Sequence, residues 1–411
     1  MKRKKKKKLL LSLKIVLVVL CATAVFAAAM VMLGGEGTLN GNSFKKTTLN
    51  KLEKEFEYNS KATLYDLFDL ENGTLVSADM PIDTGKLGEA TVKIVYKNSR
   101  GKSIEEELTY TVTDKTPPVI ICGEKYTLTV NNNIDFTQSV ISGDVCDPSP
   151  KREIIGSYDV NTLGEYPLTY RVSDASGNVS SHDFTLRVVP ASNSSGGSTP
   201  YYHFADFVSD YKGENRLYGI DVSTWQGDID WYKVKSSGVS FAIMRIGYQA
   251  GWGGDPKMDG WYLSNIEEAK KAGIDYLGVY FYSYASTLQE AETQAEWVVR
   301  NLKGVSLELG VALDWEDFSR FNSMNKSFKD MNDIARAFFG VIEENGYKGM
   351  NYGSLNYMRN IWDLPEYDTW LAHYAQQTTY EKDYLIWQRC SNGKVEGING
   401  YCDLDIMYIN H

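Results

Sequence analysis

The sequence predicts a multidomain protein whose C-terminal half is an α/β barrel, preceded by two small all-β units and an N-terminal transmembrane helix. Three observations support this organisation. An uncharged apolar segment follows a basic N-terminus, a β-rich pattern repeats at a fixed offset, and strands alternate with helices from Leu217 onward. At 411 residues with 43% hydrophobic content, the chain is long enough for several globular domains.

The N-terminus has the features of an export segment. Lys2–Lys8 is an unbroken basic block, and Ile15–Gly35 carries no charge over a length that spans a bilayer. Basic residues keep the N-terminus inside, so the chain beyond lies outside the membrane. Residues 1–36 are therefore expected to be a single-pass membrane anchor. Because Ala27–Ala29 offers small residues for cleavage, a signal peptide and a secreted protein are the alternative.

Beyond this segment the chain is acidic. The formal net charge is −10, although residues 1–35 contribute eight basic residues and no acid. Nucleic acid is therefore not an expected partner.

Four of the five cysteines lie outside the apolar segment, and each pair falls within one predicted domain. Two disulfides, Cys122–Cys146 and Cys390–Cys402, fit an oxidising exterior, with free core thiols as the alternative. No Cys/His cluster has zinc-ligand spacing, so no metal and no cofactor are expected.

Two β-rich stretches repeat at an offset of 76 residues. Leu-Gly-Glu at 87–89 returns at 163–165, and a glycine-containing turn at 98–101 returns at 174–177. Alternating apolar residues on both sides of each turn are typical of hairpins. The sequence therefore predicts two small β-sandwiches in tandem, at residues 45–113 and 114–190.

The second repeat, opening Asp114-Lys-Thr-Pro-Pro and later reading Tyr170-Arg-Val-Ser-Asp-Ala-Ser-Gly-Asn, resembles bacterial cell-surface immunoglobulin-like domains. The first repeat is a more diverged copy. The resemblance implies a stalk that lifts the next domain off the membrane, with binding of wall carbohydrate or cell-envelope proteins as the alternative. Residues 191–214 begin with a Gly/Ser-rich run and are expected to be a flexible linker that leaves 215–411 as an independent domain.

The C-terminal domain alternates strands with helices, and four times a helix ends in Gly shortly before a strand. Long helices disappear toward the C-terminus. This pattern predicts a (β/α)-barrel with an incomplete helical layer, whose chemistry lies at the C-terminal strand ends. The eight expected strands are Tyr218–Val222, Phe241–Ile246, Tyr276–Tyr282, Leu309–Trp315, Lys348–Tyr352, Thr369–Tyr374, Tyr384–Arg389 and Asp403–Ile409.

The fourth strand ends at a cluster of carboxylates. Period two places Asp314 and Glu316 on one face of Gly310–Phe318 and the odd-numbered apolar residues on the other. The acidic face is expected to line the barrel mouth, and the apolar face to pack against helices. A surface ion-pair cluster or a Ca²⁺ site is the structural alternative, although no EF-hand-like spacing is present.

An ordered series of motifs over Leu217–His411 resembles family 25 glycoside hydrolases, the Chalaropsis-type lysozymes. One departure from the family is Tyr280-Phe281-Tyr282, where many members have Tyr-His-Phe, and it implies a different substrate contact at this point. The motifs that carry the resemblance are Gly219-Ile-Asp-Val-Ser223, Trp225-Gln-Gly-Asp-Ile-Asp-Trp231, Phe241-Ala-Ile-Met-Arg245, Leu313-Asp-Trp-Glu316, Leu371-Ala-His-Tyr374, Trp387-Gln388 and Asp403-Leu-Asp405.

The resemblance implies catalytic roles for four acids. Glu316 is expected to be the general acid, because crowding by Asp314 and apolar surroundings should raise its pKa. Asp314 would orient the 2-acetamido group of the substrate, and direct attack by a carboxylate is the alternative. Asp221 and Asp403 are expected to position water and sugar hydroxyls.

Aromatic side chains near strand ends can stack on sugar rings, although such residues are more often part of a core. For His373, a structural hydrogen bond competes with a role in the site. The expected substrate-binding residues are Trp225, Tyr248, Tyr282, Tyr352, Trp387 and Gln388.

Together these features predict an exported, membrane-tethered peptidoglycan hydrolase. It would be an N-acetylmuramidase that cleaves the β-1,4 bond between N-acetylmuramic acid and N-acetylglucosamine in glycan strands. An inactive wall-binding scaffold and another hexosaminidase, such as a chitinase-like enzyme, are the alternatives.

Overall fold

The computed structural model describes residues 45–191 and 200–409. The chain divides into two compact units, with the boundary between Val112 and Thr113. Within the described ranges, no helix is long and apolar enough to cross a membrane. The anchor predicted for residues 1–36, like its signal-peptide alternative, lies outside the described residues and stays a prediction.

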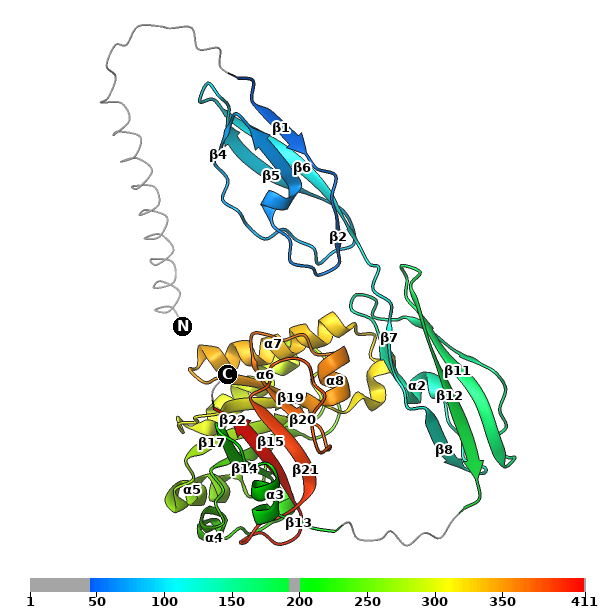
Figure 1. The fold of residues 1–411 in the computed structure, drawn as a ribbon, viewed down its shortest axis with the longest axis vertical. Helices are drawn as coiled ribbons and strands as arrows, with labels where there is room; N and C mark the ends of the chain where they lie inside the picture. Colours follow the sequence, from blue (N-terminus) through cyan, green and yellow to red (C-terminus); the bar gives the residue numbers. More distant parts are fainter. Residues whose placement is uncertain (1–44, 192–199, 410–411) are drawn as a thin grey trace. The chain divides into compact units, whose positions relative to one another are not determined.

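The first unit is built on a long hairpin of β5 (Gly88–Lys97) and β6 (Ser103–Thr113), which belongs to a four-stranded sheet (Figure 1). Alternate residues of β6, including Leu108 and Tyr110, face the core of this unit. A separate two-stranded sheet pairs β1 with β3. The other elements are β1 (Thr48–Lys51), β2 (Glu55–Glu57), η1 (Leu64–Leu67), β3 (Phe68–Glu71) and β4 (Thr74–Leu75).

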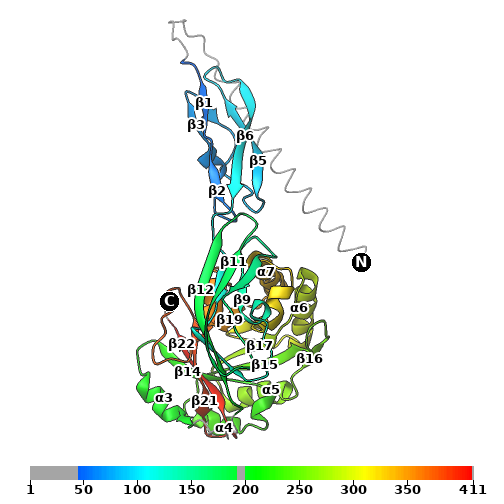
Figure 2. The same ribbon diagram turned by 90° about the vertical axis from the view of Figure 1, so that its right-hand side faces the viewer.

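The second β unit repeats this hairpin in β11 (Gly164–Ser173) and β12 (Val179–Val189), visible in Figure 2. Gly88 faces Val112 in the first hairpin and Gly164 faces Val188 in the second, so the predicted repeat is confirmed in the strand register. The immunoglobulin-like assignment stays a prediction from sequence. The other elements are β7 (Val119–Ile121), β8 (Lys125–Thr129), α2 (Phe136–Ser139), β9 (Ile141–Gly143) and β10 (Lys151–Ile155).

The C-terminal region closes eight strands into a barrel in the order β14-β15-β17-β18-β19-β20-β21-β22, with β22 returning to β14. This confirms the predicted barrel. The strands are β14 (Arg216–Val222), β15 (Phe241–Gln249), β17 (Tyr276–Tyr282), β18 (Gly310–Asp314), β19 (Gly349–Ser354), β20 (Asp368–Ala372), β21 (Ile386–Lys394) and β22 (Cys402–Tyr408).

The last barrel strand runs against the others. Neighbouring strands from β14 to β21 are parallel, whereas β22 pairs antiparallel with both β21 and β14. A reversed strand needs no crossover helix, which fits the direct connection from β21 to β22. Because β22 is reversed, its first residues lie at the barrel end where the parallel strands finish. Asp403, the second residue of β22, therefore faces Asp221 near the end of β14.

The two faces of β18 separate as the alternation predicts. Ala312 belongs to the core inside the barrel. Val311 and Leu313 belong to the larger core between the barrel and its helices, as does Trp315 just beyond the strand. The inner face of β18 therefore leads directly to Asp314 at the strand end.

The helical layer is incomplete, as predicted. Long helices follow β15, β17 and β18, whereas only a single short helix follows β19 and none lies between β20 and β22. The remaining elements are η2 (Thr224–Gln226), α4 (Trp231–Ser236), β16 (Pro256–Met258), α5 (Tyr262–Ala272), α6 (Leu288–Leu302), η3 (Phe318–Ser323), α7 (Phe328–Glu344) and α8 (Leu355–Asn360).

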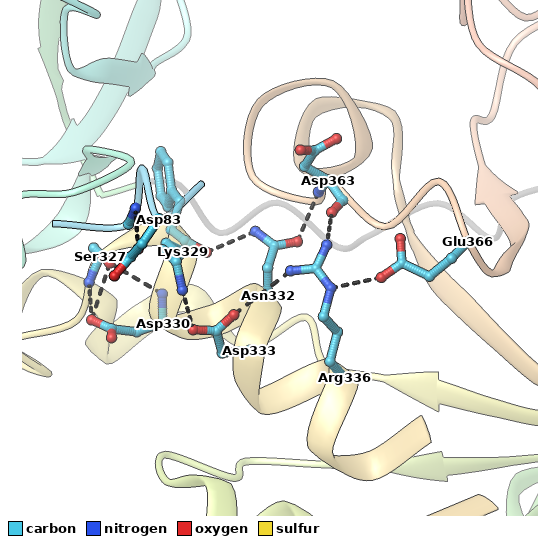
Figure 3. A network of polar contacts seen from close by, with 11 residues as sticks. Asp83, Ser327, Lys329, Asp330, Asn332, Asp333, Arg336, Asp363 and Glu366 are labelled. Atoms are coloured by element: carbon cyan, nitrogen blue, oxygen red, sulfur yellow. Dashed lines mark hydrogen bonds and ion pairs between the residues drawn. The ribbon is translucent and has the colours of Figure 1, made fainter. Parts of the chain in front are cut away.

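Helix α7 is fastened to the loop that precedes β20 (Figure 3). The amide of Asn332 donates to Phe328 O at 2.7 Å and to Ile361 O at 2.8 Å, and its oxygen accepts from Asp363 N at 2.7 Å. One turn later, Arg336 donates to Asp363 O at 2.6 Å and pairs with a carboxylate of the same loop. These bonds hold α7 against the loop between α8 and β20.

Two expectations about chain connectivity differ from the structure. The linker predicted over 191–214 contains β13 (Tyr202–His203) and α3 (Phe204–Asp210), because Phe204 and Phe207 lie three positions apart and bury against the barrel core. Residues 215–411 are also not separate from the second β unit, since the chain from Thr113 onward forms one compact unit.

The expected disulfides are absent from the described residues, where all four predicted cysteines are free. In the second β unit, the thiol of Cys146 donates to Asp114 Oδ2 at 3.2 Å, whereas Cys122 donates to Gly123 O at 3.4 Å. In the barrel, Cys390 pairs in register with Leu404, not with Cys402. The cysteines thus have separate partners, and the alternative of free thiols is the one observed.

Candidate active site

The predicted acids and several aromatic residues converge where the parallel strands end. Asp314 is the last residue of β18, and its neighbours in register are Tyr282 of β17 and Tyr352 of β19. Across the barrel, Asp221 of β14 is paired in register with Asp403. Residues that are far apart in sequence thereby form one acidic mouth.

Asp314 is only 6% exposed, and its Oδ1 has no hydrogen-bond partner. Burial raises the pKa of this carboxyl well above its ordinary value, and the charges of Glu316 and Asp221 raise it further. The positive charge of Arg245 acts in the opposite direction. The protein therefore leaves the hydrogen-bonding capacity of this buried oxygen unused.

Glu316 lies two residues beyond the strand and is half-buried. Burial is the main cause that raises its pKa, and the charge of Asp317 adds to the effect. The expectation of a raised pKa is confirmed in direction, with burial as its main cause. Glu316 and Asp314 also interact, because the charge of Glu316 raises the pKa of Asp314. A raised pKa is what a general acid requires.

Gln388 of β21 connects three residues of the mouth. Its Nε2 donates to Asp221 Oδ2 at 2.7 Å, while its Oε1 accepts from the hydroxyls of Tyr352 and Tyr374, each at 2.9 Å. In this amide orientation the nitrogen faces the Asp221 carboxyl and the oxygen faces the two tyrosine hydroxyls. Gln388 thus orients Asp221 rather than standing alone as a sugar ligand.

A further buried carboxyl, that of Asp405, interacts with Asp221. Asp405 is fully buried and accepts a bond from Trp370 Nε1 at 2.9 Å. Burial raises the pKa of Asp405 to about 8 and that of Asp403 to about 9. The charge of Asp405 also raises the pKa of Asp221, on top of burial. Several of these carboxyls therefore hold protons near neutral pH.

Arg245 is the cation of the mouth. Its guanidinium pairs with the buried Asp259 at 2.8 Å and lies over the ring of Tyr248 at 5.2 Å. Asp259 also accepts from the backbone N–H of Thr224 at 2.9 Å, next to Trp225. This ion pair connects β15 to the loop after β14 and places one positive charge where it lowers the pKa of Asp314.

The predicted aromatic ligands divide into two groups. Trp225 is 82% exposed on η2, while Tyr282 and Tyr352 adjoin Asp314. Trp387 is 3% exposed, belongs to the core outside the barrel, and donates through its indole to His373 O at 2.8 Å. The binding role predicted for Trp387 does not fit this position, because outward-facing residues alternate with Gln388 along β21.

His373 has a structural environment. Its Nδ1 is 3.1 Å from the hydroxyl of Thr378, and its backbone bonds to β21. Burial lowers its pKa, and the charges of Arg359 and Arg389 act in the same direction. The structural alternative is therefore the one that its contacts support.

Among the described residues, one group of three side chains could hold a metal ion. Asp114, Asp144 and Cys146 have ligand atoms within 4.8 Å of one another, in the second β unit and not at the barrel mouth. The thiol already donates to Asp114, and Asp144 Oδ1 accepts two backbone N–H bonds. No metal role in the mouth follows from this cluster.

Sequence reasoning missed four residues of the mouth: Arg245, Trp370, Tyr374 and Asp405. All but Trp370 lie within motifs that the sequence series includes. Strand alternation places Arg245 on the same face as Ile243, inside the barrel. A charged residue on that apolar face is the one sequence signal that could have identified Arg245. The bond from Trp370 to Asp405 joins positions 35 residues apart, and no local pattern encodes it.

An eight-stranded barrel with acids at its mouth supplies the carboxyl groups that glycoside hydrolysis requires. Residues 220–398 match the family model "Glycosyl hydrolases family 25". Within the C-terminal region, residues 220–398 therefore match a family of glycosidases, glycoside hydrolase family 25.

Similar proteins include a named lysozyme. The autolytic lysozyme of Clostridium acetobutylicum is 28% identical over 193 residues, covering 46% of this chain and 54% of that protein. The uncharacterized protein YegX of Escherichia coli K12 is 25% identical over 220 residues, covering 51% of this chain and 78% of its own. The chain thus spans about half the length of that lysozyme.

Solved structures with a similar chain include two further hydrolases. A family 25 glycosyl hydrolase from Bacillus anthracis is 24% identical, covers 53% of this chain and 96% of its own, and has a TM-score of 0.44. A bacterial lysozyme from Streptomyces coelicolor is 24% identical, covers 47% and 92%, and has a TM-score of 0.41.

Proposed function

We propose that this protein is a peptidoglycan hydrolase of the N-acetylmuramidase type. It cleaves the β-1,4 bond between N-acetylmuramic acid and N-acetylglucosamine, with glycan strands of the cell wall as its substrate. The observation that carries the proposal is the convergence of Asp221, Asp314, Glu316 and Asp403 at one barrel end. A similar protein named an autolytic lysozyme supports the choice of substrate.

Glu316 acts as the general acid that protonates the leaving oxygen. Its half-buried position, beside Asp317, keeps a proton on the carboxyl at a pH where an exposed glutamate is ionised. Cleavage develops positive charge on the sugar ring, and negative groups near that ring lower the barrier. Glu316 therefore supplies the proton, and the neighbouring acids stabilise the sugar ring through hydrogen bonds and, where a carboxyl is ionised, through its charge.

Asp314 assists from the floor of the mouth. Its Oδ1 has no partner within the protein and is free to accept the N–H of a 2-acetamido group. A substrate that carries this group can then supply its own nucleophile. Asp221 and Asp403, on opposed strands, position water and sugar hydroxyls, while Gln388 holds Asp221 in place.

The same proposal places the protein at the cell surface. The basic and apolar N-terminus anchors the chain, and the two β units separate the hydrolase from the membrane. In this arrangement the enzyme works on the wall outside its own membrane. Binding of wall carbohydrate or envelope proteins by the β units is the alternative to this stalk role.

Product analysis tests the reaction. The full chain is incubated with purified peptidoglycan, the new reducing ends are reduced with borohydride, and the resulting sugar alcohol is identified. Muramitol is the expected product. Glucosaminitol would instead indicate another hexosaminidase, and no product would indicate a wall-binding scaffold, so either result contradicts the proposal.

A further inference from the structure

The second β unit contacts the segment that follows Glu316. Asn322, in η3, accepts a hydrogen bond from Ser142 N at 3.1 Å through its Oδ1. Its Nδ2 donates to Thr137 O and Val140 O, both at 2.7 Å. One side chain thereby makes three hydrogen bonds to the backbone of the β unit, and it uses both ends of its amide.

The N-terminus of α7 is capped by the same β unit. The first N–H groups of a helix have no partner within the helix and need acceptors from elsewhere. Here Phe328 N donates to Asp144 O at 2.7 Å, and Lys329 N donates to Val145 O at 3.2 Å. The backbone carbonyls of Asp144 and Val145, which directly follow β9, therefore accept hydrogen bonds from the first N–H groups of α7.

Two aromatic side chains of the hydrolase also pack against β9. The rings of Phe321 and Phe328 stack at 5.4 Å and bury almost completely against Gly143. A Cβ on Gly143 would lie 2.7 Å from a ring carbon of each phenylalanine. Because real side chains do not approach so closely, only glycine allows β9 to lie against both rings.

The contact reaches the general acid through a short series of rings. Phe321 contacts Phe318 at 5.7 Å between centroids, and Phe318 contacts Trp315, the neighbour of Glu316, at 4.7 Å. Phe318 N also donates to Glu316 O at 3.0 Å. A 3₁₀ helix of this length is weakly stable by itself, so its position depends on such packing.

We propose that the second β unit positions Glu316 by holding η3, so that the functional hydrolase begins near Thr113 and not after the linker. Asn322 is the positioning residue. The second β unit lies wholly outside the region that matches the family model, so the family match does not include this contact. The inference rests on the proposed function, and it gives the second β unit a role in turnover in addition to its role as a stalk.

The test uses the full chain with Asn322→Ala and a matched control, Asn345→Ala. Asn345 is an exposed asparagine at the other end of α7, and its amide bonds only within that helix, to Val341 O at 2.8 Å. Gly143→Ala is a second variant, which presses on the same contact from the β unit. For each protein we measure kcat and KM per folded molecule, the melting temperature, and amide hydrogen exchange over residues 317–323.

We expect Asn322→Ala and Gly143→Ala to lower kcat by about tenfold or more, because a small misplacement of a catalytic group is costly, with KM changed less than about threefold. Exchange over 317–323 should accelerate in both variants and stay unchanged in Asn345→Ala. A smaller fall in kcat, or one explained by loss of folded protein, overturns the inference. The exchange data remain informative if the wild-type chain releases no sugar, so failure of the proposed function would be recognised separately.

Discussion

The amide of Gln388 donates to Asp221 Oδ2 at 2.7 Å, although the two residues lie 167 positions apart. The same side chain accepts from the hydroxyls of Tyr352 and Tyr374. One glutamine of β21 therefore organises polar groups from three other strands or strand ends. It also opposes the effect of burial on Asp221, because its hydrogen bond lowers the pKa of that carboxyl.

Gln388→Leu should disturb the mouth more than the fold. Asp221 and the tyrosine hydroxyls lose their partner, so the free energy of unfolding should fall by about 1–3 kcal/mol. The pKa of Asp221 should rise further, and kcat should fall by about tenfold to a hundredfold because its carboxyl is no longer oriented. Denaturant unfolding and initial rates measure the two effects. Gln377→Leu, at an exposed glutamine of the nearby loop, is the control, and equal losses in both variants would argue against the assignment.

Two tryptophans predicted to bind substrate should behave in opposite ways. Trp225→Ala removes an exposed ring, so KM should rise by about threefold to tenfold with the melting temperature unchanged. Trp387→Ala removes a buried ring and should lower the free energy of unfolding by about 3–5 kcal/mol. Kinetics and thermal unfolding of both variants check this. A destabilised Trp225→Ala with normal KM would contradict its placement.

The buried acids should make stability depend on pH. A carboxyl with a raised pKa binds its proton more tightly when folded, so its contribution is complete below the unfolded value of 3.8. That contribution is lost as pH rises toward about 8 for Asp405 and about 9 for Asp403. The melting temperature should therefore fall between pH 5 and pH 9, by about 2–4 °C for each kcal/mol lost. Asp405→Asn, which cannot ionise, should flatten this decline, and an unchanged slope would contradict the raised pKa.

Activity should be lost at high pH when Glu316 ionises. The charge of Asp317 helps to raise the pKa of Glu316, so Asp317→Asn should lower that pKa and move the alkaline limb of kcat/KM to lower pH. Asparagine retains the N-cap that Asp317 provides to Ser319 N, so η3 should stay in place. Asp333→Asn, which removes a charge on α7, is the control. A limb that moves upward, or moves equally in both variants, would contradict the assignment.

The barrel was predictable because its signals are local. Strand alternation in β18 placed Ala312 inside and Leu313 outside, and helix-ending glycines marked the crossovers. The ordered acids followed from motifs at strand ends. The burial of Trp387 was not predicted, because the sequence places this residue near a strand end but does not show whether its side chain lies inside or outside the barrel.

Long-range docking could not be read from the chain. The bonds from Asn322 join residues more than 180 positions apart, and nothing in the local sequence of either partner distinguishes them from ordinary loop residues. The Gly/Ser-rich run suggested independent domains, since linkers of that composition usually join them. In this protein, the arrangement of the second β unit and the barrel is decided by packing between residues that are distant in the sequence. The prediction of disulfides was wrong for the same reason, because the spacing of cysteines in the sequence does not determine which group each thiol contacts in the fold.

The central claim is tested most directly by comparing the wild-type chain with Glu316→Gln on purified peptidoglycan. The account predicts muramitol from the wild-type digest after reduction, and a rate about 10²–10⁴-fold lower for the variant at an unchanged melting temperature, because glutamine cannot donate the proton. Near-wild-type release by Glu316→Gln, or a wild-type digest without muramitol, would contradict it.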